Sequence, residues 1–228
     1  MPSLVAPALP AGKLSASAQP SIPGDGLLLR PWQESDRAAV VTGYADPAIQ
    51  RWHCHTMTDD EAAAWIAVWS RHWHEETGAS WAIMDGVMAG RTSLEQDGTV
   101  TGQAGLRQDG AVTGQAGLRQ VGVGDGTVAG QVGLRRVDLG EGLAAISYWV
   151  LPEFRGRRIA PRALAALTSW AFGQLGLHRL ELSHSTANQA SCRVAEQAGY
   201  RVEGVKRSEA RHADGWHDMH LHARLATD

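Results

Sequence analysis

The chain has 228 residues, 43% of them hydrophobic, and a formal net charge of -3. This length and apolar content predict one sizeable core, while the slightly acidic balance argues against a nucleic-acid partner. Two cysteines, Cys54 and Cys192, are too few for a disulfide framework and indicate a reducing compartment, which we expect to be the cytoplasm. No apolar run approaches the ~18 residues of a membrane span, so we expect no membrane partner.

Residues 1–26 are rich in Ala, Ser, Pro and Gly, which predicts a disordered tail. Pro7 and Pro10 interrupt the apolar stretch that a signal peptide would need. We expect a single domain over residues 27–228. Its first part is predicted to contain a strand at 27–32, a helix at 33–45 with Ser35 as N-cap, a stop at Asp46-Pro47, a helix after Thr58 and a strand at 80–86.

Residues 88–136 contain an internal repeat. VTGQAGLRQ occurs at 100–108 and at 112–120, VAGQVGLRR follows at 128–136, and MAGRTSLEQ at 88–96 is a diverged copy. Each copy has a strand-like segment and a Gly-rich turn signal. We interpret residues 97–126 as an insertion of duplicated strands, which we favour over a binding or assembly surface because Gly-rich strands specify register weakly.

After the repeat, strands and helices alternate. The sequence predicts a strand at 143–152, a helix from Pro161 to a stop at Gly176, a strand at 178–185, and a helix from Asn188, its cap, to Gly199. Two closing strands follow at 200–211 and 216–225. This order predicts an α/β or α+β domain with a mixed sheet.

The stretch LPEFRGRRIAPRAL, residues 151–164, places four arginines and a glycine between a strand and a helix. The first turn of a helix has free N–H groups and a positive dipole end, and arginine suits phosphate. A phosphate site and a solvated basic loop both fit these residues. There is no GxxxxGK[ST] and no GxGxxG, so neither a P-loop nor a dinucleotide site is supported.

This strand, loop and helix, with LELSHSTANQASCRVAEQAGY and VEGVKRSEARHADGWHDMHLHARL downstream, resemble the GCN5-related N-acetyltransferase (GNAT) superfamily. The similarity is greatest to its RimJ/RimL-type branch of ribosomal-protein and peptide N-terminal acetyltransferases, and covers 127–225 well and 27–96 loosely. It implies a mixed, mostly antiparallel sheet with helices on both faces and splayed strands that form an acetyl-CoA cleft. It also implies acetyl transfer from acetyl-CoA, as co-substrate, to a primary amine.

In that family the loop after the fourth strand holds the coenzyme A diphosphate, with the pattern Q/R-x-x-G-x-G/A. The matching residues are Arg155, Gly156, Arg157, Arg158, Ile159 and Ala160. Arg158 stands where the family usually has glycine. An arginine with an ordinary helical φ can still offer its N–H, so we expect coenzyme A binding to be retained. The resemblance also implies that a backbone N–H near Val150 or Leu151 polarises the acetyl carbonyl, and that Asn188 bonds the pantetheine arm.

The resemblance also implies two catalytic side chains. Many family members use a tyrosine seven residues after the capping asparagine, but here that position is Ala195. The nearest branch instead has a serine that meets the leaving sulfur, matched by Ser191, and a glutamate that acts as base through water, matched by Glu209. Without the resemblance, Ser191 is an ordinary first-turn serine and Glu209 a surface strand residue.

Trp65, Trp69 and Trp73 recur every four residues, which predicts a stripe packed in the core. The resemblance offers the alternative that Trp73 and its neighbours, with Trp52 and His53, line the acceptor pocket. It favours the N-terminal amine of a protein or peptide as acceptor, with a small-molecule amine as the alternative. A non-catalytic CoA-binding module stays open, as does a homodimer.

The ten histidines raise the question of a metal site. One residue separates His53 from His55 and His72 from His74 in the sequence. His217, His220 and His222 lie near the C-terminus. None has the spacing of a zinc finger or a zinc protease, so we expect no metal. Cys192 is predicted to be a buried small residue rather than a nucleophile.

Overall fold

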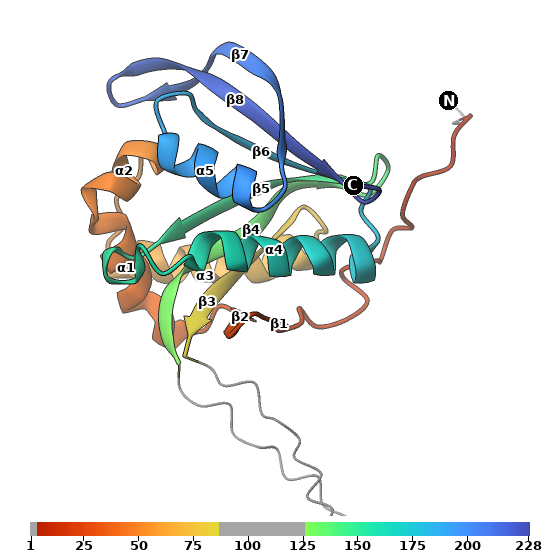
Figure 1. Cartoon of the computed structure of the whole chain (residues 1–228). Helices are drawn as coiled ribbons and strands as arrows, with labels where there is room; N and C mark the ends of the chain where they lie inside the picture. Colours follow the sequence, from red (N-terminus) through yellow and green to blue (C-terminus); the bar gives the residue numbers. More distant parts are fainter. Residues whose placement is uncertain (1–3, 87–125) are drawn as a thin grey trace, which may run out of the picture.

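A computed structural model describes residues 4–86 and 126–228. Within them the strands form one eight-stranded sheet in the order β1-β2-β3-β4-β5-β6-β8-β7 (Figure 1). Every neighbouring pair is antiparallel except β5 and β6. The strands are β1 (Ile22–Gly24), β2 (Leu27–Pro31), β3 (Gly78–Asp85), β4 (Thr127–Asp138), β5 (Leu143–Val150), β6 (Arg179–Ser185), β7 (Arg201–His212) and β8 (Gly215–Leu225). The predicted mixed, mostly antiparallel sheet is confirmed.

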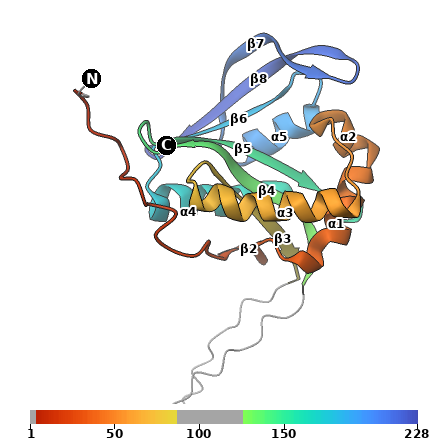
Figure 2. The same ribbon diagram turned by 180° about the vertical axis from the view of Figure 1, so that it is seen from behind.

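Helices cover both faces of the sheet. The α-helices are α1 (Arg37–Ala45), α2 (Pro47–His53), α3 (Asp59–His74), α4 (Ile159–Trp170) and α5 (Gln189–Gln197). Two short 3₁₀ helices, η1 (Glu34–Asp36) and η2 (Pro152–Phe154), and a π-helical segment that continues α4, η3 (Ala171–Leu175), complete the helices of the described residues. Opposite views show α3 on one face and α4 with α5 on the other (Figures 1 and 2). None of the helices in the described ranges is long and apolar enough to cross a membrane.

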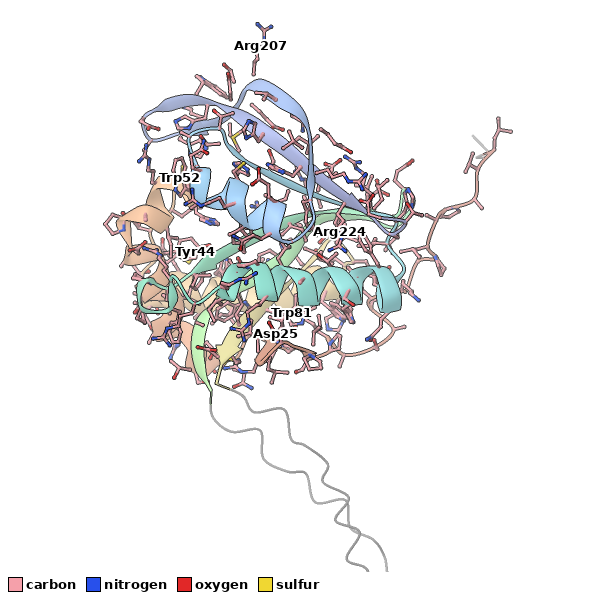
Figure 3. All side chains as sticks on the ribbon, in the orientation of Figure 1. Asp25, Tyr44, Trp52, Trp81, Arg207 and Arg224 are labelled. Atoms are coloured by element: carbon pink, nitrogen blue, oxygen red, sulfur yellow. The ribbon has the colours of Figure 1, made fainter. Side chains whose placement is uncertain are left out.

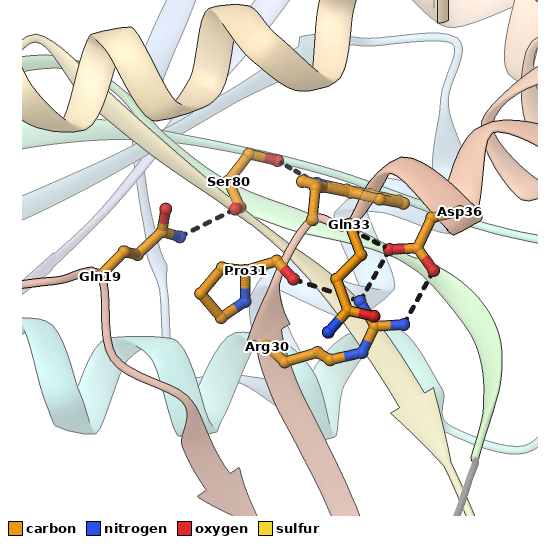
Figure 4. Close-up of polar contacts among 7 residues, drawn as sticks. Gln19, Arg30, Pro31, Gln33, Asp36 and Ser80 are labelled. Carbon is orange, nitrogen blue, oxygen red and sulfur yellow. Dashed lines mark hydrogen bonds and ion pairs between the residues drawn. The ribbon is translucent and has the colours of Figure 1, made fainter. Parts of the chain in front are cut away.

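The start of α1 differs from the prediction, because Ser35 lies inside η1 and is not an N-cap. The neighbouring Asp36 is buried, and its carboxylate accepts hydrogen bonds from Arg30 at 2.7 and 2.8 Å and from the Gln33 N–H at 2.8 Å (Figure 4). Thr58 caps α3 as predicted, and its N–H donates to Glu61 at 2.7 Å in a capping box.

The N-terminal segment packs on the domain, in contrast to the disordered tail expected from its composition. Leu14 is fully buried, and residues 22–24 form β1. The Glu76 carboxylate accepts three backbone N–H groups of this segment, between Gly12 and Ser15, at 2.7 to 3.1 Å. The indole N–H groups of Trp73 and Trp81 donate to its carbonyls at 2.8 Å. The segment is therefore ordered because it supplies acceptors to buried indoles and one apolar anchor.

The predicted insertion at 97–126 lies outside the described residues, apart from residue 126, and so do the repeat copies at 88–96, 100–108 and 112–120. The copy at 128–136 lies in the central strand β4. Its Gly130 approaches β5 so closely that a Cβ would lie 2.3 Å from the Trp149 carbonyl oxygen. In this copy the glycine is required by close strand packing.

The parallel pair β5–β6 separates along its length. Its register runs only from Leu143 opposite Arg179 to Ala145 opposite Glu181, although β5 continues to Val150 and β6 to Ser185. In Figure 1 the two halves of the sheet diverge from the end near the C-terminus, and α5 lies beside the point of divergence. The candidate site lies at this opening between β5 and β6.

Candidate active site

The basic loop between β5 and α4 is open to solvent at the start of the helix. Residues 155–158 are exposed, and Gly156 has φ +78°, with open space where a Cβ would lie. The first backbone bond of the helix runs from the Arg162 N–H to the Arg158 carbonyl. The amides of Ile159 and Ala160 therefore precede the bonded part of α4, where a helix binds anions.

Arg158 adopts the left-handed conformation, with φ +57° and ψ +26°. Arg158 therefore does not have the ordinary helical φ considered for it from the sequence. The backbone here keeps the geometry that glycine adopts freely, and an L-residue pays about 1 kcal/mol for it. Arg158 thus combines a backbone conformation that glycine adopts freely with a cationic side chain.

Most of the loop arginines are already paired. Arg155 contacts Asp46 at 2.5 Å and the Val150 carbonyl at 3.3 Å. Arg157 lies 3.7 Å from Asp85, and Arg162 lies 3.1 Å from Asp25. Among the described residues, no carboxylate pairs with Arg158. We infer that Arg155 shapes the loop, whereas Arg158 is available to a diphosphate.

The Arg155–Asp46 pair ties the basic loop to α2. The Arg155 guanidinium holds the pKa of Asp46 below its usual value, mainly through their hydrogen bond. Asp46 also caps α2, because its carboxylate accepts the Ile49 N–H at 2.9 Å. The dipeptide Asp46-Pro47, predicted only as a stop, therefore begins a helix as well.

The amides at the end of β5 alternate between two directions. The Leu151 N–H donates to the Ala129 carbonyl at 2.9 Å, so it is already bonded to the β4 side. Because bonding directions alternate along a strand, the Val150 amide points the other way, toward the opening next to β6. Of the two predicted amides, Val150 is the one free to face a ligand, and Leu151 is excluded.

A chain of hydrogen bonds connects α2, β5 and α5. His53 Nε2 lies 3.2 Å from the Tyr148 carbonyl, and Tyr148 Oη lies 2.6 Å from Ser191 Oγ. Asn188 caps α5, with its side-chain oxygen accepting the Ser191 N–H at 3.1 Å. The predicted residues His53, Ser191 and Asn188 are therefore brought together, through a tyrosine that the sequence did not single out.

Two groups in this chain keep their neutral forms near pH 7. Burial raises the pKa of Tyr148 to about 12, so its phenol stays protonated and can donate. Burial is also the main cause that lowers the pKa of His53 to about 4, and Arg135 adds to the effect. Neutral His53 donates its Nε2–H to the Tyr148 carbonyl, because a carbonyl can only accept.

Glu209 lies in an irregular part of β7, where the pairing with β8 shifts between Lys206 and Ala210. It contacts Lys206 at 2.9 Å and accepts from the Ser183 hydroxyl at 3.2 Å. Ser183 lines a small cavity of about 240 Å³ together with Arg135 and Arg136. The hydrogen bond with Ser183 thus connects Glu209 to the small cavity at the opening of the sheet.

A larger cavity of about 630 Å³ lies beside α2 and α3. It is lined by Tyr44, Trp52, His53, His55, Met57, Trp65, Trp69, His72, Thr77, Gln131, Arg135, Arg136 and Ser147. Figure 3 shows Tyr44 and Trp52 on this side of the molecule. Arg135 and Arg136 also line the small cavity beside Ser183, so the two cavities adjoin.

The tryptophan stripe of α3 divides between two roles. Trp65 and Trp69 line the larger cavity, and the buried Trp69 Nε1 has no hydrogen-bond partner among the described residues. Trp73 is buried, donates to the Ser17 carbonyl and packs against Trp81 at 6.4 Å. The prediction of Trp73 as a substrate residue is wrong, because it faces the core and the N-terminal segment.

The chain is similar in sequence to known proteins. Residues 26–201 match the family described as "Acetyltransferase (GNAT) domain". The chain belongs to the GNAT acetyltransferase family.

This confirms the predicted family, and two curated Bacillus subtilis proteins agree with it. The chain is 33% identical to the "Probable N-acetyltransferase YjcK" over 85 residues, covering 37% of this chain and 47% of the relative. It is 34% identical to the "Putative ribosomal N-acetyltransferase YdaF" over 74 residues, covering 32% and 40%. The chain thus matches less than half the length of these curated relatives.

Solved structures confirm the GNAT fold. Mycobacterium smegmatis RimJ in complex with CoA-disulfide superposes with a TM-score of 0.67 at 21% identity, covering 91% of this chain and 87% of RimJ. A chimera of Vibrio cholerae spermidine N-acetyltransferase SpeG and hSSAT gives 0.64 at 15% identity, covering 89% and 97%. These likenesses show the fold and leave the acceptor open.

In this GNAT domain the position of the usual tyrosine is filled by Ala195, which is fully buried. The phenol found near the opening is instead that of Tyr148, on a different element, bonded to Ser191. The sequence signal for Tyr148 was only its place two residues before Val150 at the end of β5, which no local motif distinguishes.

Proposed function

We propose that this GNAT domain transfers an acetyl group from acetyl-CoA to the N-terminal amine of a peptide or protein. The observation that carries the acceptor class is the lining of the 630 Å³ cavity, which among its described residues contains cations and indoles and no carboxylate. A polyamine would meet Arg135 and Arg136 without a compensating acid. A peptide end carries one amine and several carbonyls, which the guanidinium groups of Arg135 and Arg136 can bind.

The proposed roles follow from the contacts at the opening of the sheet. The amides of Ile159 and Ala160 with the Arg158 guanidinium bind the diphosphate, which fits their place in the first turn of α4, where backbone N–H groups have no intrahelical acceptor. The Val150 N–H donates a hydrogen bond to the thioester oxygen as negative charge develops on it. Alignment of both reactants in one ternary complex supplies much of the rate.

Proton transfers complete the reaction. The acceptor amine attacks the thioester carbonyl directly, and Glu209 takes its proton through a water molecule. The C–S bond then breaks, and Ser191 donates a proton to the leaving sulfur and regains one from solvent. Tyr148 is a positioning residue that holds the Ser191 hydroxyl. Asn188 caps α5 and, in this proposal, also bonds the pantetheine arm.

The acceptor class is tested with purified protein, acetyl-CoA and a panel of peptides with different first residues, alongside spermidine and small aromatic amines. Thiol release is followed, and products are located by mass spectrometry. We expect acetylation of peptide α-amines and no turnover of spermidine. Preferred acetylation of spermidine or another small amine would contradict the peptide assignment.

Two variants separate an enzyme from a CoA-binding module. Glu209→Gln and Ser191→Ala should lower kcat by about 10²-fold or more, with acetyl-CoA affinity unchanged by calorimetry. Glu141→Gln is the matched control, because Glu141 is exposed in the turn between β4 and β5. Binding of acetyl-CoA without thiol release for any amine in the panel would favour the non-catalytic module.

A further inference from the structure

A cluster of three histidines and one cysteine lies where β6, β8 and α5 meet. It consists of His184, Cys192, His220 and His222, and one ligand atom from each lies within 4.8 Å of all the others. His184 and His222 are buried, and the other two are partly buried. None of these side chains has a role in the proposed acetyl transfer.

Backbone carbonyls fix the tautomers of the two buried histidines. His184 Nδ1 lies 2.9 Å from the Ser185 carbonyl, and His222 Nδ1 lies 3.2 Å from the Tyr200 carbonyl. Since a carbonyl can only accept, each Nδ1 carries the proton, and each neutral ring keeps a lone pair on Nε2. The same arrangement orients histidines that bind metals, which donate the other ring N–H to a carbonyl.

These two lone pairs point at each other. The Nε2 atoms of His184 and His222 are 3.0 Å apart. Two acceptors at this distance in a buried place repel each other unless a positive charge lies between them. A proton on one ring would supply this charge, but that ring would then have no lone pair left for the other members of the cluster. A divalent cation satisfies both rings at once.

The remaining members complete a coordination set. His220 Nδ1 is buried and has no hydrogen-bond partner among the described residues. Cys192 Sγ lies 3.6 Å from the Glu196 carboxylate, which adds negative charge next to the cluster. Two nitrogens on a tetrahedral zinc ion lie roughly 3.3 Å apart, so the histidine pair needs an adjustment of a few tenths of an ångström.

We propose that His184, Cys192, His220 and His222 form a tetrahedral zinc site that fastens α5 to strands β6 and β8. Three imidazoles and one thiolate are ligands of the kind that zinc prefers, and a closed set of four is typical of structural sites. On binding, the Cys192 S–H bond breaks, an S–Zn bond forms and one proton passes to solvent, with no change of oxidation state. The ion would stiffen the helix that carries Ser191.

The sequence prediction of no metal rested on spacing alone. The four residues come from three elements, and the spacings between 184, 192, 220 and 222 match no zinc motif. The pairing of β6 with β8, with His184 opposite His220, brings the three histidines together, and α5 adds Cys192.

The test uses the full chain, stripped of metal with a chelator and titrated with Co²⁺ and then Zn²⁺. We expect one equivalent of Co²⁺ to give the intense visible bands of a tetrahedral site and a thiolate-to-cobalt charge-transfer band, both abolished by Zn²⁺. Cys192→Ser should lose the charge-transfer band and bind Zn²⁺ at least about tenfold more weakly. Zn²⁺ should raise the Tm of wild type and leave that of Cys192→Ser nearly unchanged.

Cys54→Ser is the matched control, because Cys54 is the other cysteine of the chain and lies outside the cluster. It should keep the Co²⁺ spectrum and the rise in Tm. His220→Asn, at a partly buried position, gives a second variant that should weaken binding while folding normally. The proposal is overturned if wild type takes up no Co²⁺, if the spectrum lacks the thiolate band, or if Cys54→Ser rather than Cys192→Ser removes it.

Discussion

Leu14→Ala tests whether the N-terminal segment belongs to the folded domain. Leu14 is 0% exposed and packs in the main hydrophobic cluster, so its truncation removes apolar contacts and leaves a cavity. Buried Leu→Ala changes cost 2–5 kcal/mol, and we expect about 3 kcal/mol here. This is a large part of the roughly 5–15 kcal/mol by which domains are stable.

Urea unfolding followed by tryptophan fluorescence measures the effect. With an m-value of about 3 kcal/mol/M, the midpoint should fall by about 1 M. Leu4→Ala is the control, because Leu4 is 103% exposed and its truncation should leave the midpoint unchanged. A shift for Leu14→Ala as small as that of the control would refute the packed segment and support a disordered tail.

Three further predictions concern the site. Arg158→Gly should be more stable than Arg158→Ala by about 1 kcal/mol in urea unfolding, because the left-handed backbone strains alanine. Equal stability of the two variants would contradict this strain. Both variants should bind acetyl-CoA about tenfold more weakly than wild type. Because the pKa of His53 falls to about 4 on folding, its contribution to stability is complete above its unfolded value of about 6.5 and is lost as pH falls toward 4. His53→Gln should flatten that part of the stability–pH curve, and an unchanged curve would contradict the shift. Tyr148→Phe should lower kcat with little change in the KM for acetyl-CoA, whereas a rise in KM alone would place Tyr148 in binding rather than in positioning Ser191.

Local sequence signals predicted much of the fold. Thr58 caps α3 and Gly176 follows the helical segment after α4, both as expected. Helix α2 was missed because Asp-Pro was interpreted only as a stop, although aspartate before proline is also a typical helix start. That signal was present in the sequence.

Other features depend on tertiary contacts that no local pattern carries. The polar composition of residues 1–26 gives no indication that Leu14 fills the core or that Trp73 needs an acceptor there. Equally, a tryptophan stripe cannot show which of its members faces the core. Tyr148 meets Ser191 only because β5 and α5 are adjacent in space.

The central claim is that the loop at residues 155–160 binds the diphosphate of coenzyme A and so directs the thioester toward the amine. Calorimetric titration with acetyl-CoA and with S-acetylpantetheine, which lacks the diphosphate and the nucleotide, tests it most directly. We expect one site for acetyl-CoA and at least about 100-fold weaker binding of S-acetylpantetheine, since two or more charge-assisted bonds are lost. No binding of acetyl-CoA, or equal affinity for the two compounds, would contradict the account.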